Sequence, residues 1–259
     1  MNLRITASRF LLRLGSFIKT LPVVIMKPDD LIEYSRQTYN TPNKIESWGD
    51  TLLLKSGLAE DELDLLSQIP DKNGELLLLG IGGGRETIPL AQMGFNITGI
   101  DFVPGMVEQA IHNAAQYGVN ITGLVQEISA LNVPPQSYDV VWLSRSMYSC
   151  IPTRKRRVEM VKRVHQSLKP GGYFICQFHR DQSAQSSKKV IFLHRLIAFL
   201  TFGNFAYEPG DLLWLNIEFA HAFSSDSKLR SELEEGGFEV VYTQTEIDPI
   251  RAGAVCRKI

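Results

Sequence analysis

The feature that most constrains the fold of this chain is a glycine-rich turn after a short run of leucines. Residues 75–105 read ELLLLGIGGGRETIPLAQMGFNITGIDFVPG, which predicts an apolar strand, a turn, a short helix and a second strand that ends at Asp101. Glycines let the main chain of the turn approach a ligand closely, and the amides that open the next helix can hold an anionic group. Asp101 lies 21 positions after Gly80, where a Rossmann-like unit places a carboxylate near a ribose. The combination predicts a site for a cofactor that contains a nucleoside.

Strands and helices are predicted to alternate from residue 75 onward. We expect strands at 75–79, 96–100, 121–125, 138–143 and 172–178, and helices at 85–93, 104–117 and 153–168. A helix at 226–235 and strands at 238–245 and 252–258 follow. Alternation is typical of a parallel sheet covered on both faces, and the all-leucine strand should be central. The last two strands are too close in sequence for a helical crossover, so they should pair antiparallel. The prediction is an α/β fold, a Rossmann-like seven-stranded, mostly parallel sheet with an antiparallel last strand.

Two segments interrupt this alternation. Residues 1–70, with helices expected at 28–39 and 59–68, are predicted to form an N-terminal helical cover over a main domain at 71–259. Residues 181–222 begin with a polar run and continue with the apolar stretch VIFLHRLIAFLTF. We therefore expect an insertion that carries its own apolar helix.

Composition argues against several classes of protein. A net charge of −1 gives no reason to expect a nucleic acid partner, and the basic run at 154–157 lacks the interleaved aromatic residues that bind single strands. Cys150, Cys176 and Cys256 match neither a disulfide framework nor a metal site, and no His, Asp and Glu cluster has ligand spacing. We expect no metal and a reducing, cytoplasmic setting.

The first 28 residues contain no acidic residue. They carry the basic residues Arg4, Arg9, Arg13, Lys19 and Lys27 among leucine, isoleucine and phenylalanine. Arg13 and Lys19 interrupt what would otherwise be a signal-peptide core, and no apolar segment is long enough to span a bilayer. Two interpretations of residues 3–19 stay open: a basic amphipathic helix in peripheral contact with a membrane, or a helix packed on the domain with solvated charges.

Five stretches of the chain resemble the class I S-adenosylmethionine-dependent methyltransferases. LLLLGIGGGR is similar to the glycine motif of that family, and GIDFVPGMVEQA to its acidic strand end. SYDVVWLSRSMY, RVHQSLKPGGYFICQF and ELEEGGFEVV resemble its fourth strand, its fifth strand with the preceding turn, and its last helix with the sixth strand. A dinucleotide fold usually has a third glycine at the start of the helix, where this chain has Arg85 or Thr87. A methyltransferase is therefore favoured over an NAD-dependent oxidoreductase.

The resemblance implies roles for nine residues in binding S-adenosyl-L-methionine. Gly80, Gly82 and Gly84 would pass under the methionine part, and Asp101 would accept both ribose hydroxyls. The other five are Phe102 and Met106 beside the adenine, Glu127 and Ile128 at its edge, and Ser144 at the amino-acid end. Leu78 stands where many members carry an acid that binds the cofactor's ammonium group. A cofactor-binding protein without catalysis therefore stays an alternative.

The resemblance also implies an acceptor site. In the family, the segment between the fifth strand and the last helix often lies over the acceptor, so residues 181–222 are expected to act as a lid. Their aromatic residues and the N-terminal cover favour a small or lipid-like acceptor. His179 and His221 are candidate bases, and Tyr148 and Tyr39 are candidates for shaping the methyl-transfer side; packing without chemistry is the alternative for each. The sequence makes no prediction of the oligomeric state.

Overall fold

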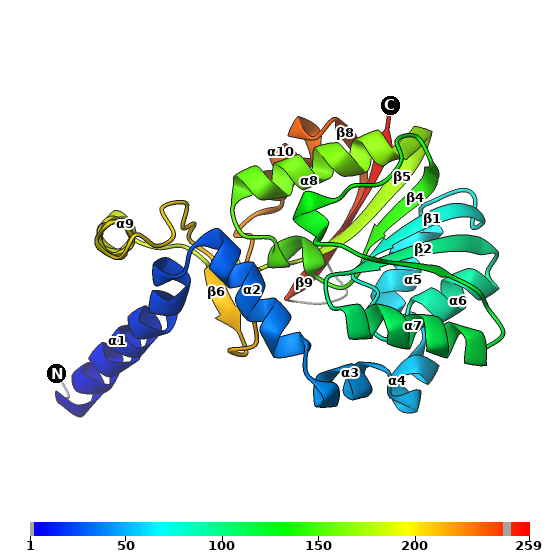
Figure 1. Ribbon diagram of the computed structural model, residues 1–259. Coiled ribbons are helices and arrows are strands. Elements are labelled where there is room, and N and C mark those ends of the chain that lie inside the picture. The colour runs from blue at the N-terminus through cyan, green and yellow to red at the C-terminus, as the bar shows by residue number, and fades with distance from the viewer. Residues whose placement is uncertain (1–2, 246–249) are drawn as a thin grey trace.

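A seven-stranded sheet lies at the centre of the computed structural model, which describes residues 3–245 and 250–259 (Figure 1). Its strands are β1 (Gly74–Leu79), β2 (Phe95–Asp101), β3 (Thr122–Val125), β4 (Tyr138–Leu143), β5 (Leu168–His179), β8 (Phe238–Gln244) and β9 (Arg251–Lys258). They are arranged in the order β3-β2-β1-β4-β5-β9-β8. Strands β1 to β5 pair in parallel, and β9 pairs antiparallel with both β5 and β8. The predicted fold class is confirmed; the link at 246–249 lies outside the described residues.

The leucine strand β1 is central, as expected, because it separates two hydrophobic cores. Leu77 and Leu79 belong to one core, which also contains residues of α8 (Arg154–Ser167) and α10 (Asp226–Glu235). Leu76 and Leu78 belong to the other, with residues of α5 (Glu60–Ser67), α6 (Thr87–Gln92) and α7 (Pro104–Gln116). Successive side chains of a strand point to opposite faces, so four consecutive leucines supply both cores.

Strand β5 begins earlier than predicted. The sequence indicated a start at residue 172, after the Lys-Pro-Gly-Gly turn, whereas the structure extends the strand back to Leu168. Leu168 pairs with Tyr138, but the next pair in the ladder joins Tyr173 to Val140. The turn is therefore a bulge inside the strand, which a pattern based on turn residues divides in two.

Four helices precede α5: α1 (Leu3–Ile25), α2 (Pro28–Tyr39), α3 (Pro42–Trp48) and α4 (Thr51–Ser56). The bounds of α2 agree with the expected helix, but the short helices α3 and α4 were not predicted. Helix α1 also continues beyond the predicted segment to Ile25, because Val23 and Val24 are fully buried in a third core. The side chain of Arg13 lies outside the described residues. No described helix is both long and apolar enough to cross a bilayer.

The insertion forms helix α9 (Lys188–Thr201) and an antiparallel pair of strands, β6 (Asp211–Trp214) and β7 (Glu218–His221). The helix was expected and the strand pair was not. Helix α9 lies beside α1, and both project from the same side of the molecule (Figure 1). Strand β6 also packs near α1, whereas β7 packs near α2 and the short helix η2 (Met147–Cys150). The strand pair therefore connects the side of the molecule that carries α1 and α9 to the elements around η2.

Candidate functional site

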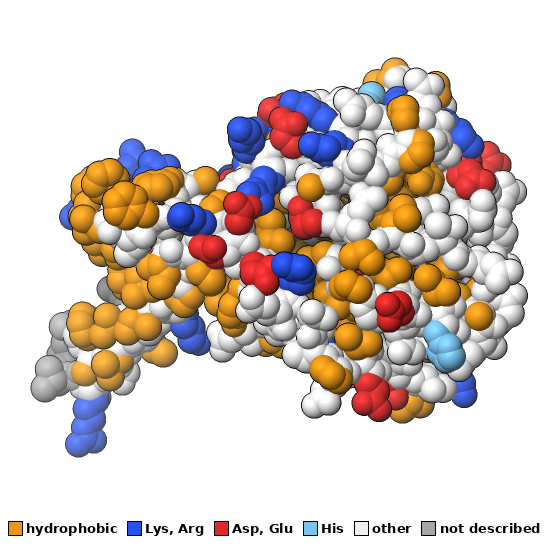
Figure 2. All heavy atoms as spheres, in the orientation of Figure 1, with side chains coloured by type: hydrophobic (Ala, Val, Ile, Leu, Met, Phe, Trp, Pro, Cys, Tyr) orange, Lys and Arg blue, Asp and Glu red, His pale blue; other side chains and the backbone are white. Residues whose placement is uncertain are grey.

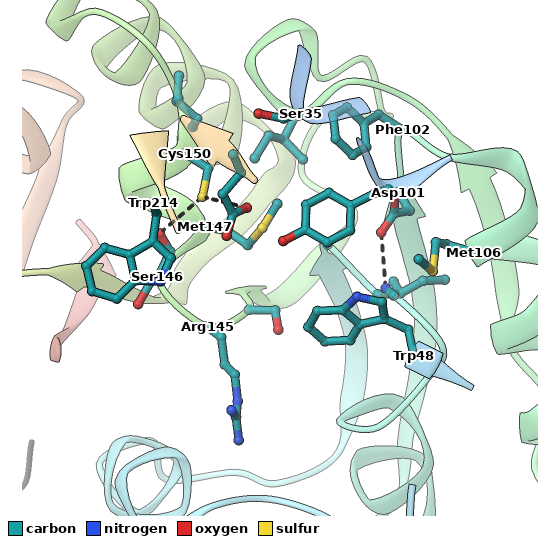
Figure 3. Close-up of a pocket in the computed structure, with 18 of the residues that line it drawn as sticks. Ser35, Trp48, Asp101, Phe102, Met106, Arg145, Ser146, Met147, Cys150 and Trp214 are labelled. Carbon is teal, nitrogen blue, oxygen red and sulfur yellow. Dashed lines mark hydrogen bonds between the residues drawn. The ribbon is translucent and has the colours of Figure 1, made fainter. Parts of the chain in front are cut away.

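A cavity of about 390 Å³ opens at the carboxyl ends of the central strands. Residues after β1, β2 and β4 line it, together with His179 at the end of β5. Helices α2 and α3 and strands β6 and β7 supply the opposite wall. In an open α/β sheet this edge is the usual ligand site, where the strand order reverses on either side of β1. Figure 3 shows Trp48, Asp101 and Met106 together at one end and Ser146, Cys150 and Trp214 at the other.

The glycine turn lines the cavity on one side and packs against helices α3 and α7 on the other. Gly82 lines the cavity with a φ of +49°, in the left-handed region that glycine adopts most easily. A side chain at Gly83 would meet the carbonyl oxygen of Trp48 at 2.1 Å, so the end of α3 rests directly on the main chain of the turn. Gly80 also lines the cavity, whereas Gly84 lies behind the turn and packs against Ala110 of α7.

Asp101 occupies the predicted place at the end of β2. Its Oδ2 accepts a hydrogen bond from the amide of Gly82 at 3.1 Å, and its Oδ1 accepts one from the amide of Val103 at 3.0 Å (Figure 3). Burial raises the pKa of the carboxyl, while these amides oppose the shift. The carboxylate is therefore fixed in orientation at the cavity wall, beside the turn that follows β1.

The predicted adenine residues come together at the same end. Phe102, Met106, Glu127 and Ile128 all line the cavity. Both carboxylate oxygens of Glu127 accept bonds from Ser129, which fixes the start of the short helix η1 (Ile128–Ala130). Trp48 completes this end, but sequence reasoning missed it because no motif marks the residue.

An acidic network lies next to Ser144, at the predicted amino-acid end. The hydroxyl of Ser144 donates to Glu86 Oε1 at 2.6 Å, and Arg85 forms ion pairs with both Glu86 and Glu62. Burial raises the pKa of Glu86, although the charge of Arg85 opposes this shift. Burial also acts to raise the pKa of Glu62, but the hydrogen bonds and charge of Arg85 outweigh it, so that pKa is lowered. Leu78 is fully buried, whereas Glu86 lines the cavity. The acid at the predicted amino-acid end of the cavity is therefore Glu86, which lies outside the position that the family motif indicates.

The other end of the cavity contains a second acid, which is half-buried. Glu218 of β7 accepts hydrogen bonds from the hydroxyl of Tyr39 and from Cys150, whose Sγ lies 3.6 Å from Oε2. Burial raises the pKa of Glu218, and the two donors only partly offset it. Beside them, His179 is buried and stacks on Trp214, with ring centroids 4.5 Å apart. Sequence reasoning missed Glu218 because it lies on a strand that was not predicted.

Of the four residues predicted at the methyl-transfer side, His179 and Tyr39 line this cavity, whereas Tyr148 and His221 lie away from it. Tyr148 is fully buried in the sheet core and donates to Glu232 Oε2 at 2.9 Å. His221 Nδ1 lies 2.7 Å from Asp211 Oδ1. Glu208, Asp211 and His221 form a group in the described part of the chain whose potential metal-ligand atoms lie within 4.8 Å of one another. Glu208 is in turn bound by Arg157, so this group is held by hydrogen bonds and an ion pair within the protein.

Residues 76–172 match a family model described as a methyltransferase domain. These residues therefore form a methyltransferase domain, in agreement with the resemblance to the class I S-adenosylmethionine-dependent methyltransferases. A ubiquinone biosynthesis O-methyltransferase of Coxiella burnetii is 30% identical over 105 residues, which are 40% of this chain and 43% of that protein. An uncharacterized methyltransferase of Synechocystis is 31% identical over 110 residues, or 42% of this chain and 49% of that protein. The chain thus spans less than half the length of these relatives.

Solved methyltransferase structures share the fold of this chain. An S-adenosylmethionine-dependent methyltransferase from Methanosarcina mazei superimposes with a TM-score of 0.59 at 22% identity, covering 78% of this chain and 99% of that chain. One from Mesorhizobium loti gives a TM-score of 0.59 at 16% identity, covering 79% and 100%. The predicted Rossmann-like fold and sheet topology are therefore confirmed.

The cavity suits S-adenosylmethionine, the cofactor of this family. It joins an oriented carboxylate at Asp101, apolar side chains at Phe102 and Met106, and a buried acid at Glu86. In addition, the hydroxyl oxygen of Ser146 is buried and lacks a hydrogen-bond partner among the described residues. A buried polar atom in a cavity wall is usually satisfied by a ligand or by water. These groups match a ligand with a diol, an aromatic base and a charged amino-acid end.

Proposed function

We propose that this chain is a methyltransferase that moves a methyl group from S-adenosylmethionine to a small or lipid-like acceptor. One observation carries the proposal: a single cavity joins the glycine turn and Asp101 to a second, half-buried acid, Glu218, on the opposite wall. A cofactor site alone would need only the first end. The second end provides space and chemistry for another reactant.

At the cofactor end, we assign Asp101 to the ribose hydroxyls and Phe102 with Met106 to the adenine. Trp48 would cover the cofactor from the side of α3, since it lies over Gly82. We assign Glu86 to the ammonium group, because it is the acid that lines the cavity beside Ser144 while Leu78 is apolar and buried. Glu86 would thus take over the contact that the family motif places at residue 78.

At the acceptor end, the proposed role of Glu218 is to accept a proton. When bound, S-adenosylmethionine supplies an electrophilic methyl group that an acceptor atom takes by in-line displacement. An acceptor hydroxyl must also lose its proton, and the raised pKa of Glu218 makes its carboxylate a stronger base than an exposed glutamate. Tyr39 and Cys150 orient that carboxylate, and His179 on Trp214 is the alternative base. Helices α2 and α3 would exclude water from the reacting atoms.

The acceptor class follows from the walls around Glu218. Ile32, Met147, Ile151 and Trp214 are apolar, and they surround a small number of polar groups. Such a lining favours an apolar molecule with one reactive hydroxyl. The names of the curated relatives that act in ubiquinone biosynthesis point to the same class of acceptor. Within the insertion, the proposed lid is the β6–β7 pair, which supplies Trp214 and Glu218.

Two measurements on the purified chain test the proposal. Calorimetric titration should show binding of S-adenosylhomocysteine and none of NADH. A labelled-methyl assay over fractionated metabolite and lipid extracts should then identify an acceptor. Glu218→Gln should keep the affinity for S-adenosylhomocysteine and lower transfer by about 100-fold or more, the scale of a lost general base. The matched variant Glu239→Gln, on an exposed position of β8, should change neither.

The buried leucine at position 78 favours a second candidate, a cofactor-binding protein without catalysis. The same experiments separate the two. Tight binding of S-adenosylhomocysteine with no transfer to any fraction would support the second candidate, and NADH binding without S-adenosylhomocysteine binding would reject both.

A further inference from the structure

Helices α1 and α9 form one projecting unit, which we call the arm and define as residues 3–25 and 188–205. Phe17 of α1 stacks on His194 of α9 with centroids 5.0 Å apart, and the hydroxyl of Thr20 lies 3.0 Å from His194 Nε2. The amide of Asn204 donates to the carbonyl of Val24 at 2.8 Å. These contacts join two segments that are far apart in sequence, so their surfaces act together.

The arm exposes an unusual amount of apolar surface. Of the 23 large hydrophobic residues that are exposed in the described part of the chain, 14 lie on the arm. Those with the highest exposure include Phe10 (64%), Leu12 (74%), Phe192 (70%), Phe199 (64%), Leu200 (67%) and Phe202 (72%). Figure 2 shows hydrophobic side chains gathered over α1 and α9 with Lys and Arg at their margins. Contiguous exposed apolar surface of this kind marks an interaction site.

The arm and the residues that flank it in sequence carry charge of one sign. Residues 1–28 and 182–207 contain eight Lys and Arg and no Asp or Glu, whereas the rest of the chain carries 19 basic and 28 acidic residues. The described basic residues Arg9, Lys19, Lys188, Lys189 and Arg195 are all exposed. A second copy docked through this surface would bring cations against cations. Anionic lipid headgroups complement it instead, since each nearby Lys or Arg strengthens binding to them.

We propose that the arm docks on the surface of an anionic lipid bilayer, with its phenylalanine and leucine side chains entering the headgroup region and its cations contacting lipid phosphates. Phenylalanine and leucine beside Lys and Arg are the composition of helices that lie in the membrane interface. The chain runs directly from α1 into α2 and from α9 into β6, and both of these elements supply cavity wall. Docking therefore places the wall of the proposed acceptor site close to the lipid. Docking itself does not depend on the proposed function.

Vesicle cosedimentation of the full chain tests the docking. Vesicles of phosphatidylcholine mixed with phosphatidylglycerol should bind about tenfold or more tightly than pure phosphatidylcholine, because several cations contribute. Phe192→Asp with Phe199→Asp should abolish this binding, and Lys188→Glu with Lys189→Glu should remove the preference for phosphatidylglycerol. Leu52→Asp, at a residue that is 80% exposed on α4, is the matched control and should bind like the unaltered chain.

The thermal midpoint and the affinity for S-adenosylhomocysteine confirm that each variant is folded. Equal vesicle binding by the unaltered chain and the Phe192/Phe199 variant would overturn the proposal. So would absence of vesicle binding together with sedimentation as a dimer that the same variant dissociates, because a second copy would then cover the arm. Vesicle binding by a chain that fails to bind S-adenosylhomocysteine would leave docking supported and the proposed function rejected.

Discussion

At the scale of single residues, we expect cofactor affinity to depend most on Asp101. Its two oxygens are already oriented by main-chain amides. Asp101→Asn should weaken binding of S-adenosylhomocysteine by about 10- to 100-fold, because hydrogen bonds to a charged group contribute roughly 1.5–3 kcal/mol. Calorimetry provides the measurement, and Asp71→Asn at an exposed turn position is the control. Unchanged affinity in Asp101→Asn would reject the ribose assignment.

Cofactor binding should depend on pH through the ionisation of Asp101. Because the pKa of this carboxyl is raised, affinity should begin to fall at a higher pH than it would with an exposed aspartate. Burial raises the pKa of Asp101 in the free protein, and binding to the ribose needs the ionised carboxylate. Affinity should therefore be complete above this raised pKa and fall as the pH drops through it. Titration with 5′-methylthioadenosine isolates the effect, because that ligand lacks the amino-acid end. In Asp101→Asn the affinity should not vary with pH over the same range.

Glu86 should discriminate between ligands with and without an ammonium group. Glu86→Gln keeps an oxygen that can accept from Ser144 but removes the negative charge. We expect affinity for S-adenosylhomocysteine to fall by about tenfold, the effect of roughly 1.4 kcal/mol lost from a charged bond, and affinity for 5′-methylthioadenosine to stay unchanged. An equal loss for both ligands would indicate a general disturbance of the Arg85 network instead.

Most of the cofactor half of the site was predictable from sequence, whereas only His179 and Tyr39 of the acceptor half were. The positions of Gly80, Gly82 and Asp101 are fixed by local spacing within one strand-turn-helix-strand unit, so a short motif is sufficient to find them. Trp48 and Glu218 reach the cavity only through the packing of remote segments. His221 and Tyr148 carry suitable chemistry, but their partners Asp211 and Glu232 hold them elsewhere.

At the scale of elements, prediction succeeded where a strand or helix has a clear period and a clear boundary. Helices α2 and α10 and strand β4 have their expected bounds. The missed elements are short: β6 and β7 have four residues each, too few to show a period. Helix α4 did carry a local signal, since Asp50 accepts from the amide of Leu52 at 2.8 Å as an N-cap.

The stability of the junction between α1 and the segment after α9 should depend on the absence of a side chain at Gly203. A side chain at Gly203 would meet the carbonyl oxygens of Val24 and Ile25 at 2.4 and 2.6 Å. Gly203→Ala should therefore lower the free energy of unfolding by about 1–3 kcal/mol, the usual cost of overpacking. Gly15→Ala, within α1 and with open space around it, should instead raise it by up to about 1 kcal/mol. Denaturant unfolding measures both, and equal effects would contradict this account of the junction.

At the scale of the whole molecule, a nearly neutral net charge conceals a separation of charge. Helices α1 and α9, which belong to the acid-free segments 1–28 and 182–207, lie together on one side, and the acidic excess belongs to the remainder of the chain. The sequence of the first 28 residues left two interpretations open, because their partner helix lies more than 150 residues later in the chain. Only the folded chain shows that both segments contribute to one apolar and basic surface.

The contact of Gly83 with the main chain of Trp48 has an evolutionary consequence. The carbonyl group of Trp48 occupies the space that a Cβ atom at position 83 would need. The glycine turn and the end of helix α3 therefore cannot change independently in evolution. A related protein whose glycine turn changed to bind another cofactor would first need helix α3 to move away from the turn. Under the proposed function, a new acceptor requires changes only on the opposite wall of the cavity, so descendants of this protein should retain their methyl donor while their substrates change.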